Sequence, residues 1–574
     1  MTKLDVTENL TSIISSAFDG SGFTLDPNSW QENGICYAGT ILVKANKFIE
    51  ACDIREGTTH IANHAFSYPR LTSVTMPDSL TTICRGAFKN CYHLDTINLS
   101  QNLTSLGDSA FSACSALTTI YLPEKLSHIG TDALGCSALA SIEVSDNNPY
   151  FNSIDGNLYT EDGQILIRYA PANPNDSFRV PEEVREIGDY AFRDSDNLSN
   201  VILSNNVEII GRWAFFSCSK LNGITLPSAV KCIESCAFRS CYFNAMFIPE
   251  TVTELQSKIF AGCYDVKVFC EATSKPDGWA EDWFEDVYTQ NVVWDAKIAS
   301  VDSALYIVED GEAILTNYSG DAEIFTIPTT VKIKGENYPV TTIDSYAFTH
   351  SNLNSIIIHD GITTLRQRAF EHCKNLQSIT IPDSVTTIEG YVFNGCINLI
   401  HISIGSGVTY MGPNVFLDTA YYNHSPHWED KLLYIGTYLV GVTKYFYDDA
   451  VIKEGTTLIP VLAFHETVGV QSVHLPASLK IICSDAFRGC KAIMTVTVAE
   501  NSQLAIIEGG AFYRCTALTE IFIPESVSFI GSNAFFECEN LTIYCEAKFG
   551  TKQWHVNWNA SGGKVIWNYV KEEQ

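Results

Sequence analysis

Apolar and polar positions alternate in a short unit that recurs along most of this 574-residue chain. In LQSITIPDSVTTIEGYVFNGCINL, which runs from Leu376 to Leu399, the apolar residues follow L-x-x-I-x-I and Pro382 ends the run. A shorter apolar pair and the step Val392-Phe393 complete the unit, and the pattern then restarts. A unit this short cannot enclose a core, so its apolar side chains need equivalent units above and below.

The phenylalanine near the end of the unit marks each copy, and we call it the marker phenylalanine. Most neighbouring markers are 22 or 23 residues apart, which predicts a repeat solenoid. Leu134 takes the marker place once, and Phe18 belongs to an earlier copy. The markers are Phe66, Phe88, Phe111, Phe192, Phe215, Phe238, Phe260, Phe348, Phe370, Phe393, Phe416, Phe464, Phe487, Phe512 and Phe535.

Each unit is expected to contain two strands. Alternation in the first strand places Ile379 and Ile381 inward and Ser378 and Thr380 outward. Pro382 has no backbone N–H to donate and ends this strand. The pair Val385-x-x-Ile388 predicts a second, shorter strand, and the segment around Val392-Phe393 predicts a short helical turn. Parallel first strands would then form one long sheet with one outward face.

Four inserts interrupt the repeats, near residues 30–50, 150–180, 303–327 and 428–452. The first and last share Tyr-x-Gly-Thr and Glu-Gly-Thr-Thr, and the middle two carry Asp-Gly between apolar runs. Such turn residues between β-branched and aromatic runs predict β-hairpins.

Two tryptophan-rich segments share the first two intervals, 9 and 4 residues, between a cysteine and two tryptophans, and predict the ends of two arrays. Cys270, Trp279, Trp283 and Trp294 lie in residues 270–295, and Cys545, Trp554, Trp558 and Trp567 lie in residues 545–570. A solenoid must cover its last apolar layer, and an aromatic segment that breaks the repeat does so. Aromatic clusters also bind sugars and choline, which is the alternative. We expect one array in residues 1–295 and a second in 296–574, each with its own cap.

Composition and charge narrow the class of partner. Hydrophobic residues make up 46% and charged residues 18%, which is typical of a globular chain. The formal net charge of −30 repels phosphate backbones and anionic lipid, so nucleic acid and membrane surfaces are poor partners. No run of apolar residues approaches the length of about 18 residues that a membrane-spanning helix needs. The start MTKLDVTENLTSIISSAF lacks a basic region followed by an apolar run, so it does not predict a signal peptide.

Ten of the 19 cysteines stand three residues after a marker phenylalanine. A position repeated once per coil stacks on itself, which predicts a column of small, buried, free thiols. Stacked strands suit disulfides poorly. A zinc site at Cys232, Cys236 and Cys241 is the alternative that the spacing leaves open. The ten are Cys91, Cys114, Cys218, Cys241, Cys263, Cys373, Cys396, Cys490, Cys515 and Cys538.

The unit resembles the leucine-rich repeat of the BspA-like family, I-x-I-P-x-x-V-T-x-I-G-x-x-A-F-x-x-C-x-x-L. Residues 381–399, 523–541 and 226–243 follow it almost throughout, and the resemblance covers nearly the whole chain. It implies a right-handed β/α horseshoe solenoid with a parallel β-sheet. It also implies a protein often found on bacterial surfaces and associated with adhesion to partner proteins, without catalytic residues or cofactor.

The candidate binding residues are the large side chains at outward strand positions. Small hydroxylated residues dominate this face, and they are also simply suited to exposed strands. Aromatic residues concentrate binding energy, so the candidates for partner binding are Tyr121, Phe247, His401, His474 and Phe522. A metal site formed by His401 and His474 is a remote alternative. No nucleophile elbow, zinc-protease helix, phosphate loop or EF-hand loop is present, so no enzyme is expected.

The sequence therefore predicts a non-enzymatic protein that binds or adheres to partner proteins through its sheet face. The resemblance favours a cell-surface or secreted location. An intracellular scaffold is the first alternative, because reducing compartments keep cysteines free and no signal peptide is present. A carbohydrate-binding surface protein that uses tryptophans is the second.

Overall fold

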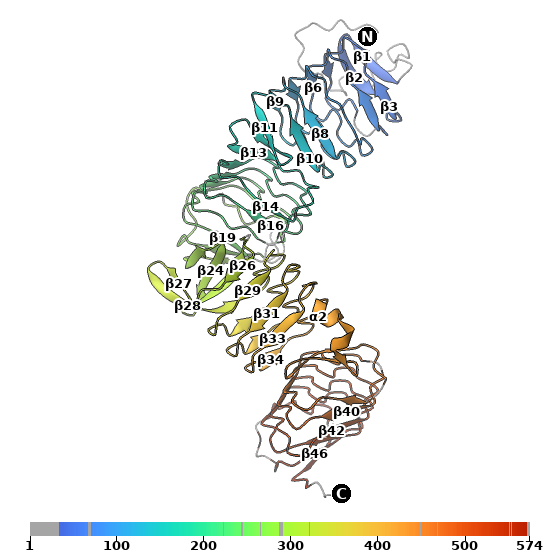
Figure 1. The fold of residues 1–574 in the computed structure, drawn as a ribbon, viewed down its shortest axis with the longest axis vertical. Coiled ribbons are helices and arrows are strands. Elements are labelled where there is room, and N and C mark those ends of the chain that lie inside the picture. Colours follow the sequence, from blue (N-terminus) through green and yellow to red (C-terminus); the bar gives the residue numbers. More distant parts are fainter. Residues whose placement is uncertain are drawn as a thin grey trace. The chain divides into compact units, whose positions relative to one another are not determined.

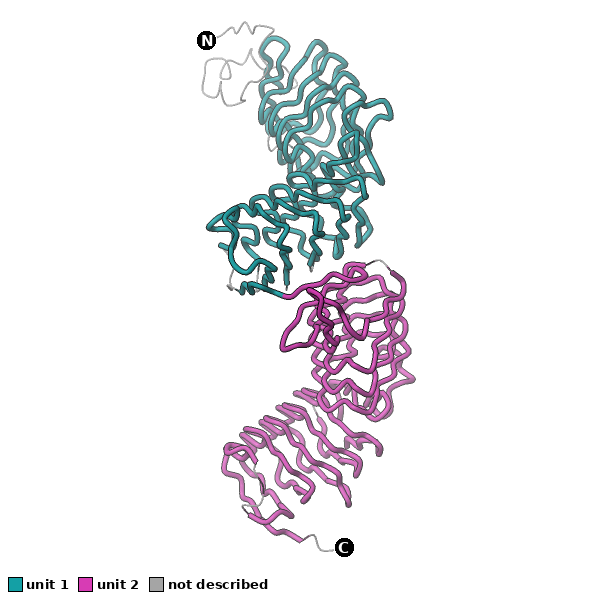
Figure 2. The backbone as a smooth tube through the Cα atoms, turned by 90° about the vertical axis from the view of Figure 1, so that its left-hand side faces the viewer, with its two compact units in different colours: residues 1–296 teal, residues 297–574 magenta. Residues whose placement is uncertain are grey.

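The chain folds into two compact units, Met1–Ala296 and Lys297–Gln574, coloured separately in Figure 2. The structure, a computed structural model, describes residues 34–570 except 67–69, 222, 243–244, 264–265, 286–290, 321, 448, 468, 550–551 and 553. The repeat expected around Phe18 lies outside the described residues. We divide each unit into two blocks. Block 1 runs from β1 (Ile35–Ala38) to β10 (Ser141–Val144), and block 2 runs from β11 (Phe151–Ile154) to β22 (Asn291–Val293). Block 3 runs from β23 (Ile298–Val301) to β34 (Tyr410–Met411), and block 4 runs from β35 (Trp428–Glu429) to β47 (Lys564–Trp567).

Each block is a stack of coils in which equivalent strands pair in parallel. The strand β31 (Ser378–Ile381) pairs in register with β33 (His401–Ile404) of the next coil. Along β31, Ser378 and Thr380 are exposed and Ile379 and Ile381 are buried, which confirms the predicted inward and outward positions. The shorter second strand, β32 (Thr387–Ile388), pairs with its equivalent in the same way. The molecule is therefore a parallel β-solenoid.

The helical turn predicted around Val392-Phe393 is not formed. Tyr391 and Gly395, two residues before and after the marker, both have positive φ, 61° and 73°. A left-handed residue ends an α-helix, so two of them this close leave only tight turns. Their N–H groups donate to the next coil instead, from Tyr391 to the Pro413 carbonyl at 2.9 Å and from Gly395 to that of Leu417 at 3.0 Å. The turns thus continue the coil-to-coil hydrogen bonding of the strands.

Unit 1 contains two long sheets of second strands and several short sheets of first strands. The second-strand sheets are β1 (Ile35–Ala38), β2 (Ile41–Ala45), β4 (His60–Ile61), β6 (Thr82–Ile83), β7 (Ser105–Leu106) and β9 (His128–Ile129), and then β11 (Phe151–Ile154), β12 (Asn157–Thr160), β13 (Ile165–Arg168), β15 (Glu186–Ile187), β17 (Ile209–Ile210), β18 (Cys232–Ile233) and β20 (Glu254–Leu255). The first-strand sheets are β3 (Ala51–Asp53) with β5 (Ser73–Thr75), β8 (Thr119–Leu122) with β10 (Ser141–Val144), β14 (Ser177–Arg179) with β16 (Asn200–Ile202), and β19 (Ala245–Ile248) with β21 (Lys267–Cys270) and β22 (Asn291–Val293).

Unit 2 follows the same plan. Its second-strand sheets are β23 (Ile298–Val301), β24 (Ala304–Glu309), β25 (Glu312–Tyr318), β28 (Glu336–Ile343), β30 (Thr364–Leu365), β32 and β34 (Tyr410–Met411), with β27 (Thr330–Ile333) beside β28, and then β35 (Trp428–Glu429), β36 (Leu432–Ile435), β37 (Tyr438–Val442), β39 (Leu458–Ile459), β41 (Ile481–Ile482), β43 (Ile506–Ile507) and β45 (Phe529–Ile530). The first-strand sheets are β26 (Ile324–Thr326) with β29 (Ser355–Ile357), β31 with β33, and β38 (Ala450–Val451), β40 (Ser472–Leu475), β42 (Thr495–Val498), β44 (Glu520–Ile523), β46 (Thr542–Cys545) and β47 (Lys564–Trp567).

Two short helices, α2 (Ala420–Asn423) and η3 (Ser425–His427), lie between blocks 3 and 4. Within the described residues, no helix has the length and apolar character needed to cross a membrane.

Antiparallel strand pairs stand at the start of every block, in the regions of the four inserts. They are β1 with β2, β11 with β12 and β13, β23 with β24 and β25, and β35 with β36 and β37. Block 3 has a further hairpin, β27 with β28, that the sequence reading missed. Each group begins a new second-strand sheet. The expectation of one long sheet of first strands is therefore wrong, because the first strands are divided among separate sheets and the longest ladders belong to the second strands.

The core of each block is a stack of marker phenylalanines. In block 3, the ring of Phe370 lies 5.0 Å from that of Phe348 and 5.1 Å from that of Phe393, and Phe416 follows 5.4 Å beyond. All four rings are buried and close to parallel. Because each ring contacts its copies in the neighbouring coils, the apolar core is continuous within a block.

The tryptophan-rich segments lie against the last marker of each unit. Trp283 and Phe284 pack edge-on against Phe260, and Trp558 packs edge-on against Phe535. The backbone follows as well: the Lys258 N–H donates to the Asp282 carbonyl at 3.0 Å and the Phe535 N–H to the Trp558 carbonyl at 3.4 Å, from positions that donate to the next repeat in other coils. These contacts cover the final ring of each stack.

The predicted cysteine column is confirmed: all ten residues are buried and free. The thiol of each donates to the carbonyl of the marker phenylalanine in the preceding coil, as from Cys396 to Phe370 at 3.0 Å. Cys136, whose repeat is irregular, makes the same bond to Phe111 at 3.0 Å. The position therefore favours a small side chain, in most coils one that donates a hydrogen bond, although the buried Ser195 occupies it without a partner. Thr467 serves the same purpose within its own coil, donating to Phe464 at 2.7 Å.

These thiols are expected to resist alkylation. Burial raises the pKa of Cys490 to about 12 and that of Cys263 to about 11, so neither forms a thiolate near neutral pH. The pKa of Cys232 is also raised to about 11, but its thiol is only half-buried. With iodoacetamide at pH 8, peptide mass spectrometry should therefore find Cys232 labelled well before the column, because the reagent can reach it. Unfolding the protein in guanidinium chloride should make Cys232 and the column cysteines react at similar rates. Rapid labelling of most column cysteines in the native protein would contradict this assignment.

Candidate functional site

The outward face of the first strands is the surface on which the sequence placed its candidate binding residues. Tyr121 lies on β8 with 46% of its side chain exposed, opposite Glu143 on β10. His401 lies on β33, is exposed and stands opposite Ser378. Both occupy two-stranded sheets, so neither belongs to an extended row of strands.

Phe247 does not fit the prediction of an exposed anchor. It lies on β19 at an outward register position, yet only 5% of it is exposed. Its ring stacks on that of Phe269 in the paired strand β21, with centroids 5.1 Å apart and planes 5° from parallel. Two large rings in the same column cover each other, so an outward position here becomes a buried one.

His474 and Phe522 belong to one six-stranded sheet in block 4, whose strands β40, β42 and β46 are labelled in Figure 1. The register pairs His474 with Val451 on one side and with Thr497 on the other. Phe522 pairs with Tyr544 on β46, and Tyr544 pairs with Ile566 on β47. We call this row the outward ladder: Val451, His474, Thr497, Phe522, Tyr544 and Ile566. Adjacent strands are about 4.8 Å apart, so it spans about 24 Å.

The ladder is apolar and aromatic over most of its length. Val451 is 64% exposed, and His474, Phe522, Tyr544 and Ile566 are half-buried. Further exposed apolar side chains lie close in sequence to the strands β38 and β42 of this sheet. They are Tyr445, Tyr447 and Met494. Exposed apolar residues gathered in this way indicate an interaction surface.

Contacts within the ladder hold its rings in place. One nitrogen of His474 is 2.7 Å from the Thr497 hydroxyl, and the other is 3.3 Å from the Ser472 hydroxyl. Tyr569 packs its ring 4.7 Å from Tyr544 and 6.3 Å from Phe522. Side chains ordered before binding lose less entropy when a partner arrives, which favours recognition.

The polar contacts of His474 do not form a nucleophilic triad. Ser472 and His474 are close, but the second ring nitrogen of His474 faces the Thr497 hydroxyl and not the carboxylate that orients histidine in a nucleophilic triad. Within the described residues, no three His, Cys, Asp or Glu side chains are placed to share a metal ion.

Sequence reasoning identified His474 and Phe522 as binding candidates, and the alternation also places Thr497 outward, but it missed Val451, Tyr544 and Ile566. Tyr544 immediately precedes the segment interpreted as a cap and Ile566 lies near the end of that segment, which hid their place in the strand register. The signal was the alternation in Thr542–Cys545 and Lys564–Trp567, which continues that of the preceding coils.

A family model for the BspA type leucine rich repeat region matches the sequence over residues 45–159, 173–268, 325–439 and 447–551. These segments make up more than half of the chain. No curated protein matches the sequence of this chain.

Several solved structures are similar to the chain. The pneumococcal vaccine antigen PcpA is 19% identical over 46% of this chain and 85% of its own, with a TM-score of 0.36. A leucine-rich repeat protein from Bacteroides ovatus is 21% identical over 66% and 79%, with a TM-score of 0.28. A leucine rich cell surface protein from Faecalibacterium prausnitzii is 19% identical over 95% and 99%, with a TM-score of 0.23.

Proposed function

Because the chain belongs to the family of BspA-type leucine-rich repeat proteins, we propose that it is a non-enzymatic binding protein that captures a partner protein on the outward ladder of block 4. The observation that carries this proposal is the outward ladder, a row over six paired strands that is apolar except at His474 and Thr497. An extended or helical segment of a partner could lie along it and place several apolar side chains on Phe522 and Tyr544. Rings at the centre of such a surface supply most of the binding energy in known interfaces.

We propose further that the protein acts at a bacterial cell surface, as the family resemblance implies. The alternative, an intracellular scaffold, gains support from the 19 free cysteines. These thiols, however, are mostly buried, and those of the column are hydrogen-bonded, so the fold itself shields them from oxidation. Their reduced state is therefore compatible with both locations. Protease treatment of intact cells distinguishes the two, since only a surface protein is digested.

The first tryptophan segment offers less support for sugar binding than the sequence suggested. Trp279 and Trp283 are buried, and their rings pack against each other with centroids 5.0 Å apart. Their contacts are those of core residues.

Removing the central rings of the ladder should abolish capture of the partner. We expect the double substitution Phe522→Ser and Tyr544→Ser to weaken binding at least 30-fold, because each hot-spot residue contributes about 2 kcal/mol or more. The measurement is biolayer interferometry against a panel of purified matrix and cell-surface proteins, with circular dichroism to verify the fold.

Tyr121→Ser is the matched control, because it removes an exposed outward ring from the other unit. It should leave the affinity unchanged. A partner that binds the double variant as tightly as the unmodified protein would place the binding surface elsewhere.

A further inference from the structure

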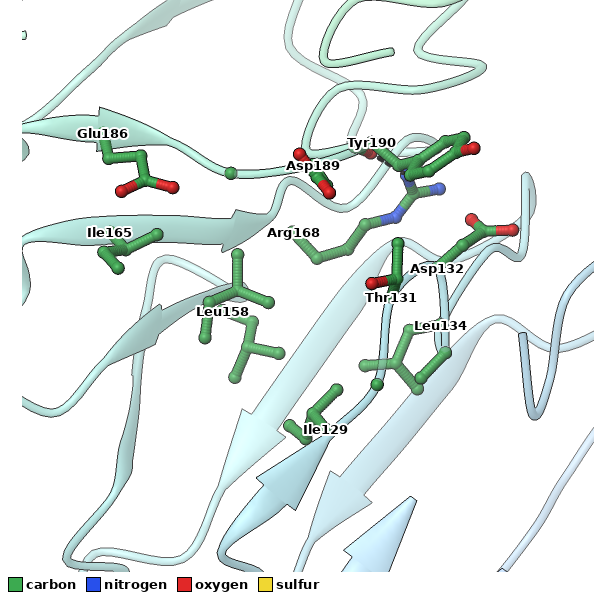
Figure 3. A pocket seen from close by; sticks show the side chains of 14 residues that line it. Ile129, Thr131, Asp132, Leu134, Leu158, Ile165, Arg168, Glu186, Asp189 and Tyr190 are labelled. Carbon is green, nitrogen blue, oxygen red and sulfur yellow. Dashed lines mark hydrogen bonds between the residues drawn. The ribbon is translucent and has the colours of Figure 1, made fainter. Parts of the chain in front are cut away.

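A cavity of about 190 Å³ lies where block 1 meets block 2 in unit 1 (Figure 3). Ile129 and Leu134 line it from the last coils of block 1, and Leu158 and Ile165 from the hairpin that begins block 2. Polar groups converge on the same space, chiefly Arg168, Asp132 and Tyr190. An apolar lining with a few convergent polar groups is the usual composition of a small-molecule site.

Arg168 brings a fixed and partly unused guanidinium to this cavity. It ends strand β13, is only 4% exposed and donates from Nη1 to the Tyr190 carbonyl at 2.6 Å. Its Nε and Nη2 atoms have no partner. These two atoms form one edge of the guanidinium, the edge that binds two oxygen atoms side by side. Strand β37 in block 4 corresponds to β13, because each pairs in parallel with the coil that follows it. At the position equivalent to Arg168, β37 has Gly441. The buried guanidinium is therefore particular to the junction in unit 1.

Asp132 supplies an unused acceptor beside it. Its side chain is 7% exposed, and Oδ2 accepts from Arg193 Nη1 at 2.7 Å and from the Ser112 hydroxyl at 3.0 Å. The other oxygen, Oδ1, has no partner. Figure 3 shows the guanidinium of Arg168 lying between Tyr190 and Asp132. Buried polar groups almost always have partners, so two donors and one acceptor without them indicate a bound polar molecule.

The charges at the cavity favour a neutral ligand. Arg168 and Arg193 are balanced by Asp132 and by Asp194, whose carboxylate binds Arg193 at 3.1 Å. Glu186 and Asp189 also line the cavity and disfavour an anion. Burying a further cation beside the two arginines would be costly as well. With anions and cations both disfavoured, the ligand that fits is an uncharged group that accepts hydrogen bonds from Arg168 and donates one to Asp132.

We propose that this cavity binds one neutral monosaccharide ring, two of whose neighbouring hydroxyls interact with Arg168 and Asp132. Hydroxyls both accept and donate, which matches the unused atoms. The volume equals that of about six water molecules at about 30 Å³ each, enough for a single sugar ring. The apolar lining from Ile129 and Ile165, both half-buried, would contact the C–H face of the ring. This site is separate from the outward ladder and from the tryptophan segments.

The test is calorimetric titration of the full chain with D-galactose, D-glucose, D-mannose and N-acetyl-D-glucosamine, each up to 20 mM. We expect one of them to bind with one-to-one stoichiometry, and Arg168→Met to weaken it at least tenfold. Arg212→Met is the matched control, because it removes the same charge from an exposed side chain two coils further on and should not change the affinity.

Two further measurements keep the proposal testable if Arg168→Met does not fold. Saturation-transfer NMR with the unmodified protein needs no variant, and Ile165→Phe narrows the cavity while leaving the polar atoms in place. The proposal is overturned if none of the sugars binds, in which case water satisfies the polar atoms, or if binding survives both substitutions. Binding of acetamide without any sugar would assign the cavity to an amide and overturn it too.

Discussion

Phe393→Ala is expected to lower the free energy of unfolding by about 3–5 kcal/mol. Phe393 is fully buried and contacts a marker ring on each side, with centroids at 5.1 Å from Phe370 and 5.4 Å from Phe416. Removing it deletes two stacking contacts and leaves a cavity in the middle of block 3 that the flanking coils cannot fill, because their backbones are held by hydrogen bonds. Urea unfolding followed by circular dichroism measures the change.

Thr380→Ala is the control from the neighbouring first strand. Its side chain points outward and is exposed, so the free energy of unfolding should stay within about 0.5 kcal/mol of the unmodified value. If both substitutions destabilise the protein equally, the register of inward and outward positions is wrong by one residue, since a slip of one exchanges the two faces of a strand.

The repeat itself made most of the fold predictable. Its period required stacked coils, the alternation around Ile379 fixed which side chains face inward, and the recurring cysteine required a buried position. Each of these inferences rests on a property that every coil shares. An error in one copy would have conflicted with all the others.

The turns could not be predicted in the same way, because their conformation depends on the neighbouring coils. Tyr391 and Arg368 are not glycines, yet both have positive φ, which residues with a Cβ rarely adopt. The conformation directs the Arg368 N–H to the Gly390 carbonyl at 3.1 Å in the next coil, as it does for Tyr391. Hydrogen bonds between coils thus select a local geometry that the sequence of one unit disfavours.

The binding residues were predictable only in part, for two different reasons. The alternation identified Phe522 as outward, but outward does not mean exposed, as Phe247 stacked on Phe269 demonstrates. Arg168 gave no signal at all. It belongs to a hairpin outside the repeat, and its approach to Asp132 depends on how that hairpin joins block 1, which no local pattern encodes.

Separating the chain between residues 295 and 296 should yield two soluble fragments, 1–295 and 296–574, each with a cooperative thermal transition close to that of the parent. Every sheet of the described residues lies wholly within one of the two units. The strands on either side of the cut, β22 and β23, pair with strands of their own unit. Expressing the two halves separately and following circular dichroism on heating tests the expectation. An insoluble second half would favour a single continuous solenoid.

The tryptophan segment decides whether the first half can fold alone. Shortening it to residues 1–269 removes Trp279, Trp283 and Phe284 and exposes the ring of Phe260 and the edge of strand β21 to water. We expect this fragment to aggregate or to lose its cooperative transition. The point variant Trp283→Ala should cost about 3–5 kcal/mol within 1–295, as large-to-small changes of buried aromatic residues do. Phe549→Ala, which removes a mostly exposed ring from the other segment, should change the stability of 296–574 little. If residues 1–269 melt as cooperatively as 1–295, the segment decorates the last coil and does not cap it.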